Sequence, residues 1–158
     1  MSLPRVQHWD TTAFHEFLLA RRSAPFKWGE NDCALFAADG IEAITGVDIA
    51  QEFRGTYTTE AGALARIAAV CGGSTVADAA VYCAEKHGLV EWKFPLMAQR
   101  GDLVVFQNGA NLIAGLVHLA GRHIVAVGPG GLFRFPIAEV DEQTGAISTA
   151  IARAWHYE

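Results

Sequence analysis

Charged residues are scarce in this chain, and they do not gather by sign. Asp, Glu, Lys and Arg make up 18% of the 158 residues, whereas hydrophobic residues make up 51%. This composition excludes a disordered protein and supplies ample material for a core. The basic residues form no run longer than Arg21-Arg22, and the formal net charge is -5. We therefore expect no nucleic-acid partner.

Long hydrophobic runs are also missing. The stretch from Leu103 to Gly121 contains no charged residue, but polar residues and glycines such as Asn108 and Gly109 divide it into two strand-sized pieces. A membrane span needs about 20 consecutive apolar residues, so none is expected. Met1 to Asp10 lacks the basic and apolar regions of a secretory signal, so we do not expect export through the general pathway.

Cysteines are few, and their number is odd. The chain has three, at Cys33, Cys71 and Cys83, without metal-ligand spacing. A disulfide framework is therefore not expected, and a reduced compartment, the cytoplasm in which the chain is made, is the default. We expect neither a metal nor a cofactor.

The length of the chain fits one domain spanning residues 1–158, large enough to bury roughly 70% of the surface of the unfolded chain. Helical periodicity in the first half gives way to strand periodicity after Gly101, which predicts an α+β fold. The expected helices run from Asp10 or Thr11 to Arg22, Asn31 to Gly46, Thr59 to Val70 and Thr75 to Lys86. The expected strands are Asp102 to Phe106, Leu112 to Ala120, Arg122 to Gly128, Leu132 to Phe135 and Ile147 to His156, with a polar loop from Glu139 to Gly145. They predict an antiparallel sheet of about five strands.

Cys33 is the first candidate for chemistry because it falls in the first turn of the predicted second helix. Unpaired N–H groups and the helix dipole stabilise a thiolate there, so its pKa should fall below the free value of ~8.5. The alternative is a buried structural cysteine. Cys71 and Cys83 fall late in their helices, where the dipole opposes ionisation, and we interpret them as structural.

Three segments together resemble the NlpC-type cell-wall endopeptidases of the papain-like clan. They are Pro25-Phe26-Lys27-Trp28-Gly29, Asn31-Asp32-Cys33-Ala34-Leu35-Phe36 and Arg100-Gly101-Asp102-Leu103-Val104-Val105-Phe106. With Thr45-Gly46-Val47-Asp48 and Phe53-Arg54-Gly55-Thr56-Tyr57, the chain is similar to an uncharacterised branch carried by phages and prophages near their tail genes. The resemblance covers roughly Pro25 to Tyr157, and the order and spacing of the motifs carry it.

The resemblance implies a papain-like fold in which the Cys33 helix packs centrally on the C-terminal sheet. It also implies a Cys33 thiolate facing a histidine general base on the adjacent strand, with an amide of a peptidoglycan stem peptide as substrate. The family's histidine position falls on Ala114, which is a departure from the pattern. Phe26, Trp28 and Asp32 are candidates for substrate binding, although aromatic packing and helix capping are alternative roles for them.

Two histidines are candidates to replace the missing base. His118 shares the strand face of Ala114, but four residues of strand place it roughly 13 Å away unless the strand is bulged or the register differs. His123 begins the next strand and approaches the same end of the sheet across the hairpin. For both, a structural histidine is the alternative.

Two hypotheses therefore remain open. One is a phage-associated thiol peptidase or amidase that opens peptidoglycan stem peptides, with Cys33 and either His118 or His123 as catalytic residues. The other is a catalytically inactive papain-like module, whose partners are phage tail proteins and which becomes part of the virion tail. The cysteine at the head of its helix favours the enzyme, and Ala114 favours the inactive module.

Overall fold

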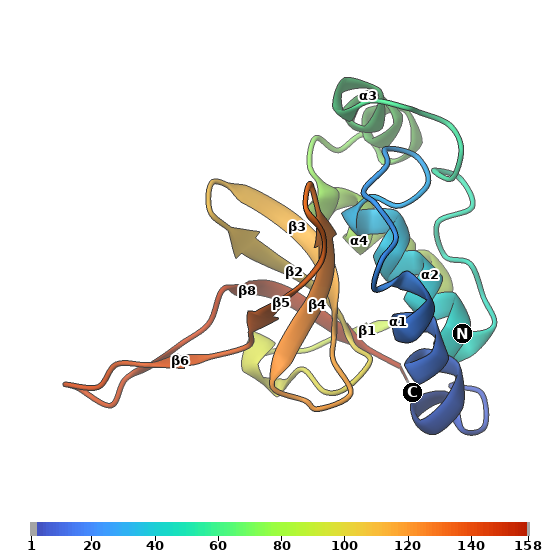
Figure 1. Ribbon diagram of the computed structural model, residues 1–158. Helices are drawn as coiled ribbons and strands as arrows, with labels where there is room; N and C mark the ends of the chain where they lie inside the picture. Colours follow the sequence, from blue (N-terminus) through green and yellow to red (C-terminus); the bar gives the residue numbers. More distant parts are fainter. Residues whose placement is uncertain (1–2, 158) are drawn as a thin grey trace.

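The computed structural model describes residues 3–157 and shows an α+β fold, with helices in the first part of the chain and a sheet in the second (Figure 1). The helical elements are a π-helical turn η1 (Trp9–Ala13), α1 (Phe14–Arg21), α2 (Cys33–Thr45), α3 (Glu60–Cys71), α4 (Val76–His87) and a 3-10 turn η2 (Pro95–Met97). The strands are β1 (Val90–Glu91), β2 (Leu103–Asn108), β3 (Asn111–Val117), β4 (His123–Gly128), β5 (Gly131–Pro136), β6 (Glu139–Val140), β7 (Ile147–Ser148) and β8 (Ile151–His156).

Six of the strands form one sheet in the order β1-β8-β2-β3-β4-β5, and each neighbouring pair is antiparallel. The hairpin of β2 and β3 turns at Gly109, which has a φ of 62°. The Asn108-Gly109 turn expected from the sequence is therefore confirmed. Its register places Val105 opposite Ala114 and Leu103 opposite Leu116.

The helices cover one face of this sheet, and α2 lies next to it (Figure 1). Leu35, Phe36 and Ile41 of α2 are fully buried in one core with Leu116 and Val125 of the sheet. A second core lies on the opposite face, where neighbouring strand residues such as Val104, Val117 and Ile124 point. Because successive strand residues point to opposite faces and both faces are buried, the strand sequences are nearly continuous runs of apolar residues.

Side-chain caps fix the helix ends close to the positions expected from the sequence. Asp32, Thr59 and Thr75 cap the N-termini of α2, α3 and α4 through their side-chain oxygens. Gly46, Gly72 and Gly88 end the same helices in the left-handed conformation. The observed boundaries differ from the predicted ones by one or two residues, and α2 begins at Cys33 rather than near Asn31.

The structure corrects the prediction at both ends of the chain. The first predicted helix is divided into a π-helical turn and a short α1 that begins at Phe14. The last predicted strand is divided into β7 and β8, and the predicted polar loop from Glu139 to Gly145 contains β6, which pairs only with β7. The separate ribbon formed by residues 138–148 projects from the body of the molecule, and we call it the arm (Figure 1).

The sheet also has a sixth strand that the sequence did not predict. β1 has two residues, both exposed, and pairs with β8. A two-residue strand has no periodicity to detect, and distant residues supply its partner. Within residues 3–157, no individual helix is long and apolar enough to cross a bilayer, and α3 with α4 meets those criteria only as a pair bent by 41°.

Candidate functional site: the cleft at Cys33

Asp32 lies at the candidate site as the residue directly before Cys33, which begins α2. Its side chain is 1% exposed and accepts three hydrogen bonds: from the backbone N–H of Leu35 (2.9 Å), from the backbone N–H of Gly29 (3.0 Å) and from the hydroxyl of Tyr57 (2.7 Å). The first is a helix cap, and the other two attach the flanking segments to the helix. The capping role considered for Asp32 is therefore confirmed, and the carboxylate has an additional joining role.

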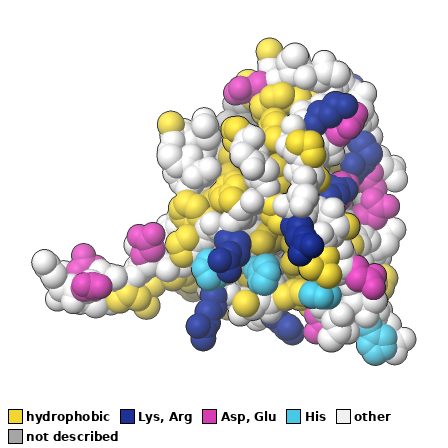
Figure 2. Space-filling view, in the orientation of Figure 1, with side chains coloured by type: hydrophobic (Ala, Val, Ile, Leu, Met, Phe, Trp, Pro, Cys, Tyr) yellow, Lys and Arg dark blue, Asp and Glu magenta, His cyan; other side chains and the backbone are white. Residues whose placement is uncertain are grey.

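A cleft of about 350 Å³ opens beside these residues. Phe26, Trp28 and Asp32, the three predicted binding residues, all line it together with Cys33. Phe26 and Trp28 meet edge to face, with ring centroids 4.9 Å apart. The remaining lining is mostly aliphatic and comes from α2, α3, α4, β2, β3 and the end of β4. Figure 2 shows hydrophobic side chains along the junction between the sheet and the helices.

The thiol of Cys33 is less acidic than the sequence predicts. Its pKa is raised to about 11, because burial and, to a lesser extent, the neighbouring charge of Asp32 outweigh the backbone hydrogen bonds from Ala114 and Ala34, which lower it. The prediction of a lowered pKa is therefore wrong. The dipole argument was incomplete because it counted the helix N-terminus and omitted both desolvation and the adjacent carboxylate. At neutral pH the cleft holds a neutral thiol.

Ala114 lies against this thiol, since its backbone hydrogen-bonds to Cys33 and both residues line the cleft. The position that the resemblance assigns to a histidine base therefore faces Cys33, with a methyl group there. Among residues 3–157, no histidine lines the cleft. The structure does not bring His118 or His123 into the lining that surrounds Cys33.

His118 and His123 lie together at the other end of β3. The backbone N–H of His118 donates to the carbonyl of His123 at 2.8 Å, and Nδ1 of His118 accepts a hydrogen bond from the N–H of Ala120. Burial lowers the pKa of His118, and the charges of Arg134 and His123 lower it further. The two histidines therefore belong to a cationic region of the surface, separate from the cleft.

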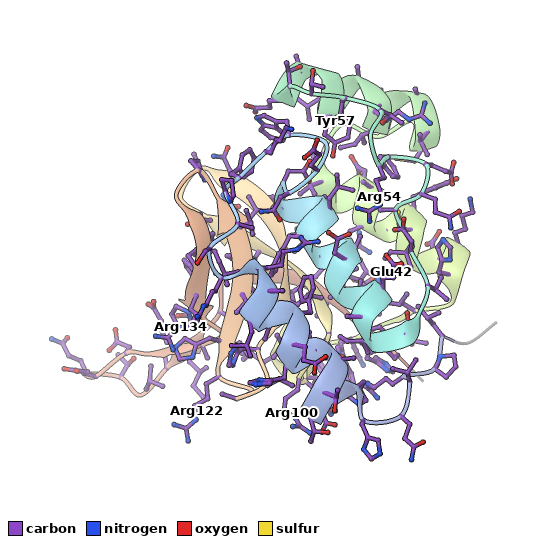
Figure 3. The ribbon with its side chains drawn as sticks, turned by 45° about the vertical axis from the view of Figure 1, so that its right-hand side comes forward. Glu42, Arg54, Tyr57, Arg100, Arg122 and Arg134 are labelled. Atoms are coloured by element: carbon purple, nitrogen blue, oxygen red, sulfur yellow. The ribbon has the colours of Figure 1, made fainter. Side chains whose placement is uncertain are left out.

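Tyr57 is a site residue that the sequence did not single out. It lies between α3 and the first turn of α2 (Figure 3), donates its hydroxyl proton to Asp32, and lines the cleft. Burial, the charge of Asp32 and the hydrogen bond to Asp32 raise its pKa above the usual range. The segment Phe53 to Tyr57 belongs to the resemblance, but no spacing rule links a loop tyrosine to a helix 25 residues earlier.

The polar groups of the cleft are acidic or neutral. Asp32 and Glu60 supply carboxylates, Asn108 and Asn111 supply amides, and the described lining contains no Lys, Arg or His. No group of three or more His, Cys, Asp or Glu suited to a metal ion occurs in residues 3–157. The lining of the cleft is therefore mostly apolar, and its described residues offer no cation to pair with an anionic ligand.

Comparison with known protein families places the chain in a described family. Residues 4–143 match the family described as "Domain of unknown function (DUF6950)". No curated protein and no solved structure matches the chain. The family match covers most of the 158 residues, so this chain belongs to the DUF6950 family.

Proposed function

We propose that this chain is a non-catalytic binding module with a papain-like, NlpC-type fold, which holds an apolar group in the Cys33 cleft as a component of a phage or prophage tail. The placement in a tail comes from the sequence resemblance. The observation that carries the loss of catalysis is Ala114, because an alanine facing Cys33 cannot accept its proton.

The state of the thiol supports the same proposal. The thiolate is the nucleophile in cysteine chemistry, and a pKa of about 11 leaves little of it at neutral pH. A catalytic cysteine needs a base or a cation to counter this, whereas Asp32 adds a negative charge beside the sulfur.

The lining of the cleft also argues against a peptidoglycan stem peptide as the ligand. The stem-peptide amide that the resemblance implies is typically the bond between D-glutamate and diaminopimelate. The free carboxylates of these two residues need cationic or hydrogen-bonding partners when they are buried. The described lining offers two carboxylates and no Lys, Arg or His. An uncharged apolar side chain or acyl group fits this surface better.

Phenylnaphthylamine, a neutral fluorophore that brightens in apolar surroundings, tests the binding function. The native protein should bind it, and Ala114→Leu should weaken binding at least about tenfold by filling the cleft with three further carbon atoms. Ala20→Leu, on the exposed side of α1, is the matched control and should leave binding unchanged. Equal binding by all three proteins would exclude the cleft as the binding site.

The thiol hydrolase remains the second candidate, favoured by the position of Cys33 at the head of α2 and in the cleft. Cleavage of host peptidoglycan is measured for the native protein and for Cys33→Ala, His118→Ala and His123→Ala. The binding function predicts no cleavage by any of them. Cleavage by the native protein that disappears with Cys33→Ala would establish the hydrolase instead, and the histidine variants would then identify its base.

A further inference from the structure

The arm, residues 138–148, has a composition and a position that its own chain does not explain. β6 and β7 contribute two residues each, and all residues from Ala138 to Ser148 are exposed. A ribbon of two short strands is marginally stable in water when nothing packs on it. A partner surface that covers the arm would remove this instability.

One face of the arm is apolar. Val140 and Ile147 are directly paired across the ribbon and are 61% and 62% exposed. Cross-strand partners point to the same face, so these two side chains form a single apolar spot. Val140 lies midway between Ile137, where the chain leaves the body, and Gln143 in the terminal turn.

The rest of the arm is acidic. Glu139, Asp141 and Glu142 lie on it, and residues 137–149 include no Lys or Arg. Asp141 is occupied within the turn, where its carboxylate accepts hydrogen bonds from the backbone N–H groups of Gln143 and Thr144. Glu142 next to it is exposed at the tip.

A cationic surface lies at the root of the same arm. It comprises Arg122 and Arg134 with His118 and His123, and we call it the root patch. The carbonyl of Arg122 accepts a hydrogen bond from the N–H of Ile137 at 3.1 Å, which fixes this arginine at the root. Arg134 lies in β5, four residues before the arm begins at Ala138. Both side chains are exposed (Figure 3), and Figure 2 shows basic and histidine side chains near the root and acidic ones on the arm.

We propose that two copies of this chain associate through their arms, with the acidic tip of each arm on the root patch of the other copy. The arm projects away from its own root patch (Figure 1), so its tip reaches such a surface only on a second molecule. When two arms lie side by side and point in opposite directions, the acidic tip of each arm contacts the root patch of the other copy. The midpoint, Val140 with Ile147, then meets its own equivalent. This is the self-complementary contact of a two-fold dimer.

Sedimentation of the full chain at micromolar and submillimolar concentrations tests the proposal. The native protein should show a reversible species of twice the 17.0 kDa mass of one chain. Val140→Ser with Ile147→Ser should raise the dissociation constant at least about tenfold by removing the apolar contact. A native protein that remains a monomer throughout would overturn the proposal and leave the arm to a different partner.

Charge exchange distinguishes this contact from any other dimer. The tip variant Glu142→Lys with Gln143→Lys and the root variant Arg122→Glu with Arg134→Glu should each lose association, because tip and root then carry like charges. Their mixture should associate again, since each tip then faces a root of opposite charge. Glu42→Lys, on the outer surface of α2 (Figure 3), is the control and should dimerise normally. Dimers that persist in either double variant, or a mixture that stays monomeric, would overturn the proposal.

Discussion

Cys33 is the residue at which two local effects oppose each other. The first turn of α2 favours a thiolate, because its free N–H groups and the helix dipole attract negative charge. Burial and Asp32 favour the neutral thiol, and they prevail, because the pKa rises to about 11. Loss of solvation near an existing carboxylate therefore outweighs the partial charge of a helix end at this position.

Asp32→Asn should lower the pKa of Cys33, because it removes the neighbouring negative charge. Burial is the larger cause of the raised pKa and remains, so the value should stay above the ~8.5 of a free thiol. Alkylation of the native fold across pH, with the modified peptide quantified by mass, measures the change. Glu42→Gln, exposed on the same helix, should leave the value near about 11. A pKa that does not fall in Asp32→Asn would mean that the carboxylate does not act on the sulfur.

At the scale of the elements, the sequence predicts those features that depend on neighbouring residues. The ends of α2, α3 and α4 follow from Asp32, Thr59, Thr75 and the glycines that end each helix. β1 and β6 were missed, and β7 was joined to β8 in one predicted strand, because two-residue strands have too few positions for a period. Strand pairing brings Ala114 beside Cys33, whereas Tyr57 enters the site through a loop that no periodicity describes.

The loop between α2 and α3 is attached to the start of α2 at one crowded point. Gly29 has a φ of 82°, donates its N–H to Asp32, and accepts a hydrogen bond from Gly55 at 3.3 Å. A Cβ at Gly29 would lie 2.0 Å from the carbonyl oxygen of Tyr57. Only glycine therefore allows the loop to approach this closely and to place the Tyr57 hydroxyl on Asp32.

Gly29→Ala should consequently destabilise the protein more than Gly46→Ala does. Gly46 has nearly the same φ, 80°, but no atom lies within 4 Å of its virtual Cβ. The change at Gly46 thus costs only the left-handed backbone conformation, about 1 kcal/mol. Gly29→Ala should add at least about 1 kcal/mol for the displaced loop and the lost Tyr57 hydrogen bond. Urea unfolding of the two variants measures both free energies, and equal losses would contradict the crowding argument.

At the scale of the whole molecule, stability and association depend on different parts of the chain. On either side of the arm, Ile137 belongs to the second core and Ala150 packs against that core, whereas neither core contains a residue from 138–148. The hydroxyl of Thr149 donates to the carbonyl of Ile137 at 2.6 Å, so the two ends of the arm are joined within the body. The arm is therefore an appendage of a body that is already closed.

Replacement of residues 139–148 by Asn-Gly should therefore leave the body folded while it removes self-association. No buried side chain is lost, the Thr149 hydrogen bond closes the shortened turn, and a shorter loop has a smaller closure entropy. The free energy of unfolding of the monomer should change by no more than about 0.5 kcal/mol. Urea unfolding at low protein concentration measures this change, and sedimentation at high protein concentration measures association.

The full-length Val140→Ser, Ile147→Ser protein is the control, because it weakens the contact without shortening the chain. A shortened protein that unfolds much more easily than this control would show that the arm stabilises its own body, whereas one that still dimerises would locate the contact elsewhere.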